Sequence, residues 1–159
     1  MSRLMSAAVT AAAAVLAGGI ASADVSSKAV IGAFRGQLVI SKDELPDGKN
    51  DKDTIAKIKG ARLTELVGTP TGEDVTSWHF HYTAFLNKTG AKTLKMEFYR
   101  DGKTYSADKR LDSVDPKSAV LTGDISIDEN EGLAKGKSYV IKLSTDNNVV
   151  VATTPLTFK

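Results

Sequence analysis

Apolar and polar residues alternate with a period of two through most of the chain after residue 30. The alternating segments are "AFRGQLVIS", "VTSWHFHYTAFL", "TLKMEFYR", "AVLTGDISID", "SYVIKLS" and "NVVVATTPLTFK". Such alternation is typical of strands with one buried face. Turn residues, such as Asp101-Gly102 and Asp146-Asn147-Asn148, separate the segments at the spacing of roughly 8 to 12 residues found in all-β sandwiches. The pattern predicts an all-β, antiparallel sandwich of seven to eight strands.

The inward positions of these strands form the predicted core. In "SWHFHYTAF" the even-numbered residues point inward, and His79, His81, Thr83 and Phe85 are left on an outer face that we expect to be solvated. Phe85 is unusual on such a face, and a covering loop would account for it. The full predicted core is Phe34, Leu38, Ile40, Leu63, Trp78, Phe80, Tyr82, Leu94, Met96, Phe98, Leu121, Ile125, Tyr139, Ile141, Leu143, Val151 and Phe158.

Residues 53–67 fit two structures. The spacing of Ile55, Ile58 and Leu66 suits a helix capped by Asp53 or Thr54, whereas "KIKGARLTEL" also suits an edge strand with a bulge at Gly60. A glycine inside a helix costs about 1 kcal/mol, and the surrounding segments are all β. We therefore predict a strand with a bulge here.

One short motif points to a specific kind of sandwich. Leu133 is followed by Gly136 and then by Tyr139 at the start of the strand "YVIKL". This spacing resembles the tyrosine corner of fibronectin type III and related immunoglobulin-like domains, in which the tyrosine hydroxyl bonds to backbone a few residues upstream. The resemblance covers about 30 residues and implies a fold and not a function. The chain departs from antibody domains because it has no cysteine, and because Trp78 begins its strand.

The first 23 residues predict export. Arg3 precedes an apolar run that ends near Ile20, and the small residues Ala21-Ser22-Ala23 then form a cleavage site before Asp24. The run is short and rich in alanine, below the roughly 20 strongly apolar residues that a membrane span needs. We therefore predict a cleaved signal peptide over residues 1–23 and a single domain over residues 24–159. With the absence of cysteine, this favours the periplasm or cell surface of a bacterium.

Composition excludes several classes of partner and reaction. The formal net charge is only +2, with 21 basic and 19 acidic residues, so the chain lacks the concentrated basic surface that nucleic acids require. The sequence contains no Gly-x-Ser-x-Gly elbow, His-Glu-x-x-His motif or phosphate-binding loop. We expect no enzyme activity, although a hydrolase with a pair of acids is conceivable from the number of carboxylates.

The two histidines are the best candidates for chemistry. His79 and His81 are the only histidines in the chain, and their spacing places both on one strand face, where imidazoles can bind zinc or copper. A third ligand would come from a neighbouring strand, and Asp124 is one candidate if the two strands pair. The other reading is a solvated strand face without metal and without any cofactor.

The favoured function is a non-enzymatic binding, adhesion or envelope-structural module, with an unknown protein or a surface glycan as partner. The alternative is a small periplasmic protein that binds zinc or copper through His79 and His81. The segment "DGKTYSADKRL" carries Lys103, Lys109 and Arg110 on what we expect to be an edge strand. Charged edges usually block strand pairing, and docking of a partner's strand is the functional alternative.

Overall fold

The structure of the protein, a computed structural model, describes residues 24–72 and 74–159. Strands predominate among these residues, so the predicted all-β class is confirmed. The predicted signal peptide, residues 1–23, lies outside the described residues. In chain order the elements are α1 (Lys28–Phe34), β1 (Gln37–Ser41), α2 (Asp51–Ala61), β2 (Glu65–Leu66), β3 (Thr69–Pro70), β4 (Thr76–Phe85), β5 (Leu94–Arg100), β6 (Thr104–Leu111), β7 (Val120–Asp128), the 3₁₀ turn η1 (Glu129–Glu131), β8 (Lys137–Thr145) and β9 (Val150–Phe158).

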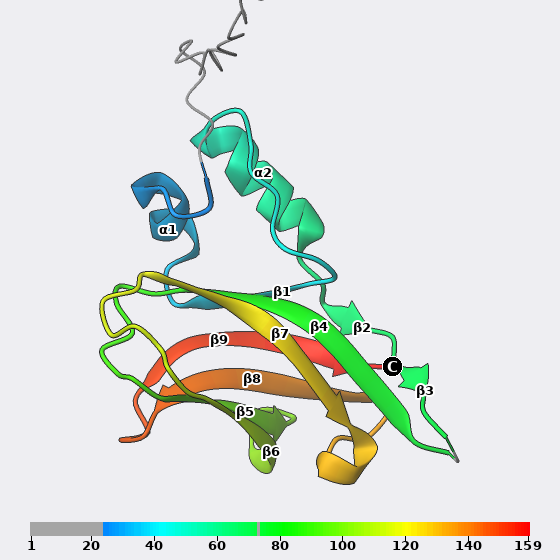
Figure 1. The fold of residues 1–159 in the computed structure, drawn as a ribbon. Helices are drawn as coiled ribbons and strands as arrows, with labels where there is room; N and C mark the ends of the chain where they lie inside the picture. The colour runs from blue at the N-terminus through cyan, green and yellow to red at the C-terminus, as the bar shows by residue number, and fades with distance from the viewer. Residues whose placement is uncertain (1–23, 73) are drawn as a thin grey trace, which may run out of the picture.

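The long strands form one curled sheet in the order β7-β4-β1-β9-β8-β5-β6, with the short β3 beside β4 and the short β2 beside β9. The curl brings the β7-β4-β1 half opposite the β9-β8-β5-β6 half (Figure 1), which gives the expected sandwich. The sandwich is not purely antiparallel, because β1 and β2 both run parallel to β9. Strands β1 and β9, where the two halves meet, are paired at one position, Gln37 with Thr153.

The interior of the sandwich holds the main core. Every predicted core residue except Phe34 belongs to this cluster, with Leu63, Leu121 and Val151 only partly buried at its margin. Phe158 lies at its centre, where its ring meets Trp78 and Tyr139 edge-on at centroid distances of 5.2 and 5.5 Å. Edge-to-face pairs of this kind add to the stabilisation that the burial of apolar surface provides.

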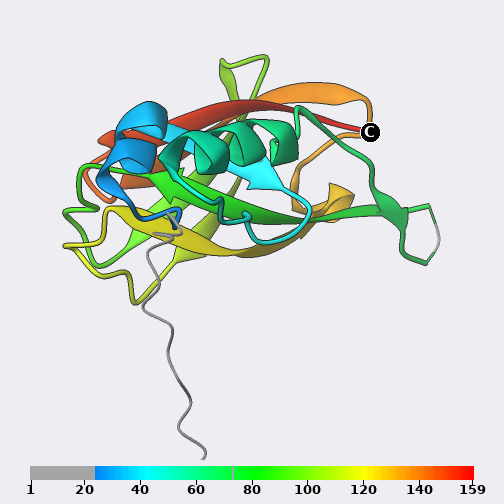
Figure 2. The same ribbon diagram turned by 90° about the horizontal axis from the view of Figure 1, so that it is seen from above.

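A helical layer covers the outer face of β1 and β4, and the sequence did not predict it. Phe34 belongs to α1 and packs on Phe85 with ring centroids 5.2 Å apart. Val30 and Ile58 join them in a second cluster on Val39 of β1. Figure 2 shows the two helices side by side on one face of the sheet. Phe85 is thus covered by a helix, and Phe34 lies outside the sandwich core.

The prediction of a strand over residues 53–67 is wrong, because α2 occupies most of this segment. The Asn50 side chain caps α2 by accepting a hydrogen bond from the Asp53 amide at 2.9 Å. Gly60 is the second-last residue of α2, with open space around the position a Cβ would take. The free-energy cost of a glycine in a helix therefore affects only the last turn of α2. Within this segment only Glu65–Leu66 forms a strand. Within the described residues no helix has the length and apolar character to cross a membrane.

The tyrosine corner is present as the resemblance implied. The Ala134 amide donates a hydrogen bond to the Tyr139 hydroxyl at 2.9 Å, and the Tyr139 ring is buried. Gly136 between them has φ = +77°, a conformation that glycine adopts without strain. The Leu133, Gly136 and Tyr139 spacing therefore encodes a real turn that fixes the entry to β8.

Candidate functional site

The pairing of β4 with β7 positions both histidines. In this antiparallel pair His79 lies opposite Ser126, and His81 lies opposite Asp124. Each imidazole uses Nδ1 to contact its partner: His79 meets the Ser126 hydroxyl, and His81 lies 3.1 Å from Oδ1 of Asp124. Asp124 was named as a candidate ligand on the condition that these two strands pair. They do pair, so the condition is met.

The two histidines differ in burial, so the prediction of a solvated outer face is only partly right. His79 is exposed, whereas His81 is 8% exposed and Thr83 is fully buried. Nε2 of His81 and the hydroxyl of Thr83 are buried without a hydrogen-bond partner among the described residues. Thr83 lies opposite Val39 of β1, on which the helical layer packs, and alternation alone could not reveal this neighbourhood.

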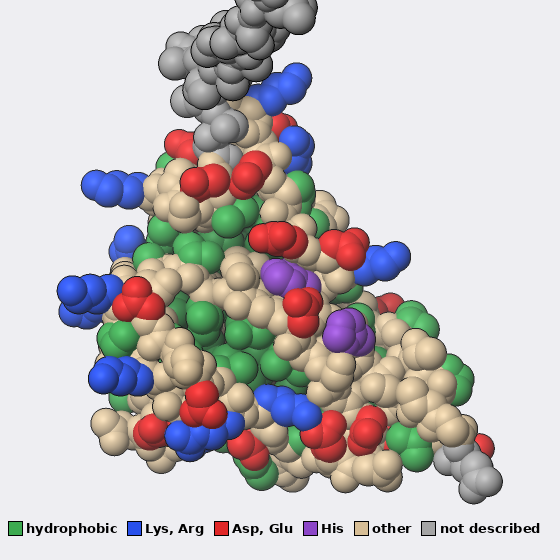
Figure 3. All heavy atoms as spheres, viewed as in Figure 1, with side chains coloured by type: hydrophobic (Ala, Val, Ile, Leu, Met, Phe, Trp, Pro, Cys, Tyr) green, Lys and Arg blue, Asp and Glu red, His purple; other side chains and the backbone are tan. Residues whose placement is uncertain are grey.

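Metal binding at this face has limited support from the geometry. Among residues 24–72 and 74–159, no three His, Asp or Glu side chains gather where they could hold a metal ion. Since Nδ1 of each imidazole already contacts β7, only Nε2 remains for a metal, and that of His81 is buried. Figure 3 shows both histidines on one face with acidic side chains close by.

The histidines also do not form the relay of a serine hydrolase. In that relay one imidazole contacts both the serine and the carboxylate. Here Ser126 contacts His79 and Asp124 contacts His81. The serine and the carboxylate are thus attached to different rings, and among the described residues no carboxylate orients the His79 ring that contacts Ser126.

A second feature of β7 is its free edge. Strand β7 pairs with β4 over nine residues without a register shift, and no other described strand pairs with it. Just before β7, the Ala119 carbonyl accepts a hydrogen bond from Leu86. Because backbone groups alternate in direction along an antiparallel strand, the odd-numbered residues of β7 face β4. The amides and carbonyls of Thr122, Asp124 and Ser126 consequently face away from the sheet.

Side chains close both ends of this free edge. The Ser118 hydroxyl donates to the Val120 carbonyl at 2.8 Å, and the Asp128 amide donates to Glu131 at 3.1 Å. The Glu131 carboxylate also pairs with Lys109, and this contact lowers the pKa of Glu131 below its ordinary value. The open part of the edge is therefore confined to the middle of β7, where Thr122, Asp124 and Ser126 are exposed.

Strand β6 forms the other edge of the sheet, as expected for "DGKTYSADKRL". This edge is partly covered, because a Cβ on Gly132 would lie only 2.2 Å from the Ser106 carbonyl oxygen. Gly132 therefore packs directly on the backbone of β6, and the Lys109–Glu131 pair lies on the same side. The edge proposed from the sequence for docking is thus less accessible than that of β7.

Gly123 in the middle of β7 makes room for Tyr82 on β4. The two residues are directly opposite, and a Cβ on Gly123 would lie 2.9 Å from the Tyr82 hydroxyl oxygen. Burial raises the pKa of Tyr82, and the nearby charge of Asp124 raises it further. Tyr82 is therefore neutral at physiological pH, and its polar end lies beside the free edge.

Sequence reasoning identified the histidines and named Asp124, but it missed the free edge of β7. The signal was present in part, since the outward residues of "AVLTGDISID" carry no lysine or arginine. Basic side chains commonly protect an edge strand. Which strand is an edge is nevertheless a property of the whole sheet, and it could not be read from one segment.

Comparison with known proteins adds little to this description. No protein-family model and no curated protein matches the chain. A solved structure, an immunoglobulin-like protein from Pseudomonas aeruginosa, is similar over 77% of this chain and 90% of its own, with 10% identity and a TM-score of 0.39. A score this low carries no argument, and the all-β sandwich with its tyrosine corner rests on the strands and hydrogen bonds of this chain.

Proposed function

We propose that the protein is an exported, non-enzymatic binding module that holds an extended segment of a partner protein along the free edge of β7. The observation that supports this proposal most directly is that the backbone amides and carbonyls of Thr122, Asp124 and Ser126 face away from the sheet. An exposed sheet edge of this kind binds an added strand through main-chain hydrogen bonds. Export rests on residues 1–23 of the sequence and implies a partner in the periplasm or at the cell surface of a bacterium.

The form of the edge supports recognition rather than protection. Natural edges are usually blunted by bulges, prolines, lysines or short length. Strand β7 is nine residues long, contains no proline and no basic residue, and has no bulge against β4. A long, flat edge that lacks these devices is suited to accept another strand.

Charge indicates what the partner strand carries. Asp124 lies at the centre of the edge with its side chain 66% exposed, and Asp128 and Glu129 follow it. Opposite charges on directly paired residues stabilise a strand pair. We therefore expect a lysine or arginine of the partner segment opposite Asp124, and apolar residues on the side of Leu121 and Ile125.

The same charge argues against a second copy of this chain as the partner. Two β7 strands paired antiparallel over their full length would place Asp124 directly opposite Asp124 of the other copy. Like charges in this position destabilise the pair. Self-association through β7 would thus contradict the proposal of a separate partner protein.

Hydrogen exchange followed by NMR tests the edge directly. In the free protein the amides of Thr122, Asp124 and Ser126 should exchange fast, and those of Gly123 and Ile125 slowly. Addition of a synthetic nine-residue peptide with alternating lysine and valine should protect the first three. Fast exchange of these three amides at saturating peptide, or slow exchange without it, would refute strand addition at β7.

Two variants at one position provide the matched control. Thr122→Pro removes an outward amide and should abolish peptide binding, because proline is tolerated at an edge but cannot donate. Thr122→Ala keeps the amide and should bind as the wild type does. If Thr122→Pro unfolds, Asp124→Lys keeps the backbone intact and should weaken binding of the basic peptide at least tenfold. Unchanged binding by Asp124→Lys would contradict the charge argument.

The zinc or copper alternative is favoured by one observation, the unpartnered Nε2 of His81 next to an exposed His79. Elemental analysis of the purified chain, with melting curves in zinc and in copper, tests it. Stoichiometric metal that is lost in a His79→Ala, His81→Ala variant would replace the proposed function. Binding of the lysine–valine peptide without metal would support the strand-addition proposal instead.

Export is tested separately. Expression of the full chain in a bacterium, followed by N-terminal sequencing of the released protein, should give Asp24 as the first residue. A chain that keeps Met1 in the cytoplasm would contradict export while leaving the edge of β7 unaffected.

A further inference from the structure

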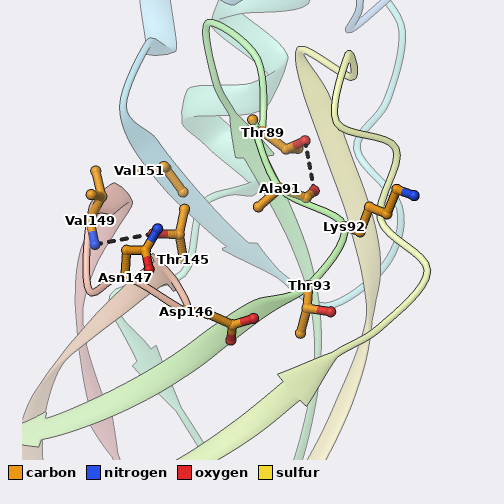
Figure 4. A pocket seen from close by; sticks show the side chains of 10 residues that line it. Thr89, Ala91, Lys92, Thr93, Thr145, Asp146, Asn147, Val149 and Val151 are labelled. Carbon is orange, nitrogen blue, oxygen red and sulfur yellow. Dashed lines mark hydrogen bonds between the residues drawn. The ribbon is translucent and has the colours of Figure 1, made fainter.

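A pocket lies at one end of the sandwich, where the segment before β5 meets the turn between β8 and β9. Its volume is about 600 Å³, within the range of roughly 300–1,000 Å³ that small-ligand sites occupy. Two segments line it: residues 89–93, which lead into β5, and residues 145–151, which include the turn between β8 and β9 (Figure 4). Loops at the ends of a rigid sandwich are common places for binding residues.

The polar lining contains side chains that the fold does not use. Lys92, Thr93, Asp146 and Asn147 all line the pocket, and none of their side chains has a hydrogen bond or ion pair to another described residue, although the charge of Asp146 helps to raise the pKa of Arg110. Thr89, by contrast, is committed to the fold, because its hydroxyl donates to the Asp115 carbonyl at 2.6 Å. Figure 4 shows the carboxylate of Asp146 and the hydroxyl of Thr93 below Ala91. The free groups are thus a carboxylate, an amide and a hydroxyl, together with the Lys92 amine.

Apolar side chains form part of the pocket lining. Ala91, Val149 and Val151 contribute to its lining, and Val149 is 58% exposed. Its neighbour Val150 is 49% exposed, so this turn presents apolar surface that a ligand could cover. The pocket therefore offers apolar side chains and hydrogen-bonding groups from both lining segments.

The charge of the lining does not favour a strongly charged ligand. Lys92 is the one cation of the lining and Asp146 the one anion, so the net charge is zero. The Lys92 side chain points away from the turn at residues 145–149 (Figure 4), so the amine and the carboxylate do not converge on one point. This arrangement does not suit a phosphate, a carboxylate or an amino-acid zwitterion.

We propose that this pocket binds a neutral sugar unit. A sugar ring presents an apolar face of C–H groups and an edge of hydroxyls, each of which both donates and accepts. The apolar face would lie on Val149 and Val151, and the hydroxyls would bond Asp146, Asn147 and Thr93. Because the pocket opens at the end of the domain, the unit can be a free sugar or the terminal residue of a surface glycan.

Titration of ¹⁵N-labelled protein with defined sugars tests the proposal. The probes are glucose, galactose and N-acetylglucosamine, each as the free sugar and as the terminal unit of a trisaccharide, with glycine as a zwitterionic comparison. At least one sugar should cause saturable shifts confined to residues 89–93 and 145–151. Tighter binding of the trisaccharide would identify a glycan end as the ligand, and equal binding would identify the free sugar.

Variants make the outcome decisive. Asp146→Asn combined with Asn147→Ala should weaken sugar binding at least fivefold without loss of thermal stability, since neither side chain has a partner in the fold. Asp43→Asn, at an exposed aspartate outside the pocket, should bind as the wild type does. The absence of shifts with all six sugars, equal binding by the double variant, or stronger shifts with glycine would each overturn the proposal.

Discussion

The carboxylate of Asp124 on β7 lies 3.1 Å from the imidazole Nδ1 of His81 on β4. Asp124 is 66% exposed, whereas the His81 side chain is almost completely buried. The other imidazole nitrogen, Nε2, has no partner among the described residues. The pair therefore couples a buried ring to a solvated carboxylate, and its two members should respond differently to substitution.

Replacement of His81 by leucine should leave the free energy of unfolding unchanged or raise it by about 1 kcal/mol. An unsatisfied buried polar atom costs about 1–3 kcal/mol, and leucine removes that cost, while Asp124 regains water. Urea unfolding of His81→Leu measures the effect, with His79→Leu as an exposed control. A loss of more than about 2 kcal/mol would mean that Nε2 of His81 holds a water or a metal ion in solution.

Gly60→Ala should stabilise the protein by about 0.5–1 kcal/mol, because alanine is the better helix former and the added Cβ meets nothing within 4 Å. Gly48→Ala is the contrasting change, since its Cβ would lie 2.3 Å from the Thr54 amide nitrogen. We expect that variant to be clearly destabilised. Thermal unfolding of both proteins distinguishes a helix from the bulged strand that the sequence favoured.

Tyr139→Phe should cost about 1 kcal/mol of stability, because the Ala134 amide loses its acceptor while the buried ring is kept. Tyr105→Phe removes a hydroxyl that bonds Asp108 on the surface, a contact that raises the pKa of Tyr105 to about 12. Loss of this exposed contact should have little effect on unfolding. Equal effects in the two variants would show that the tyrosine corner does not stabilise the fold.

Glu131 should make stability depend on pH in the acid range. The Lys109 ammonium, aided by the Asp128 amide, lowers the pKa of Glu131 below its ordinary value of 4.5. The unfolded chain therefore binds a proton first as pH falls, so the contribution is complete above pH 4.5 and is lost as pH falls through the lower, folded value.

Comparison with Glu131→Gln isolates this charge, because glutamine can still accept from Asp128. The wild type should be more stable than the variant by about 0.5 kcal/mol at pH 7, as expected for an exposed ion pair. This difference should shrink below pH 4.5. A difference that stays constant down to pH 2 would show that the Lys109 contact does not set it.

Much of the fold could be read from local patterns. Phe80 and Tyr82 face the core because successive side chains of β4 point to opposite faces of the sheet, and Tyr139 forms its corner because a glycine at the right distance permits the turn. Both depend on residues close together in the chain. The helix α2 was misread for a related reason, since the propensity of Gly60 was weighed without knowing that it lies at the helix end.

The sequence by itself determined the all-β class, the inward faces of the long strands, the tyrosine corner and the identity of the two histidines as candidates. Only the tertiary structure decided that His81 is buried while His79 is exposed, that Asp124 is the residue opposite His81, and that β7 has a free edge. The physical reason is range. Alternation and turn chemistry act between neighbours, whereas burial of an outer face and the position of a sheet edge depend on helices and strands that pack from distant parts of the chain.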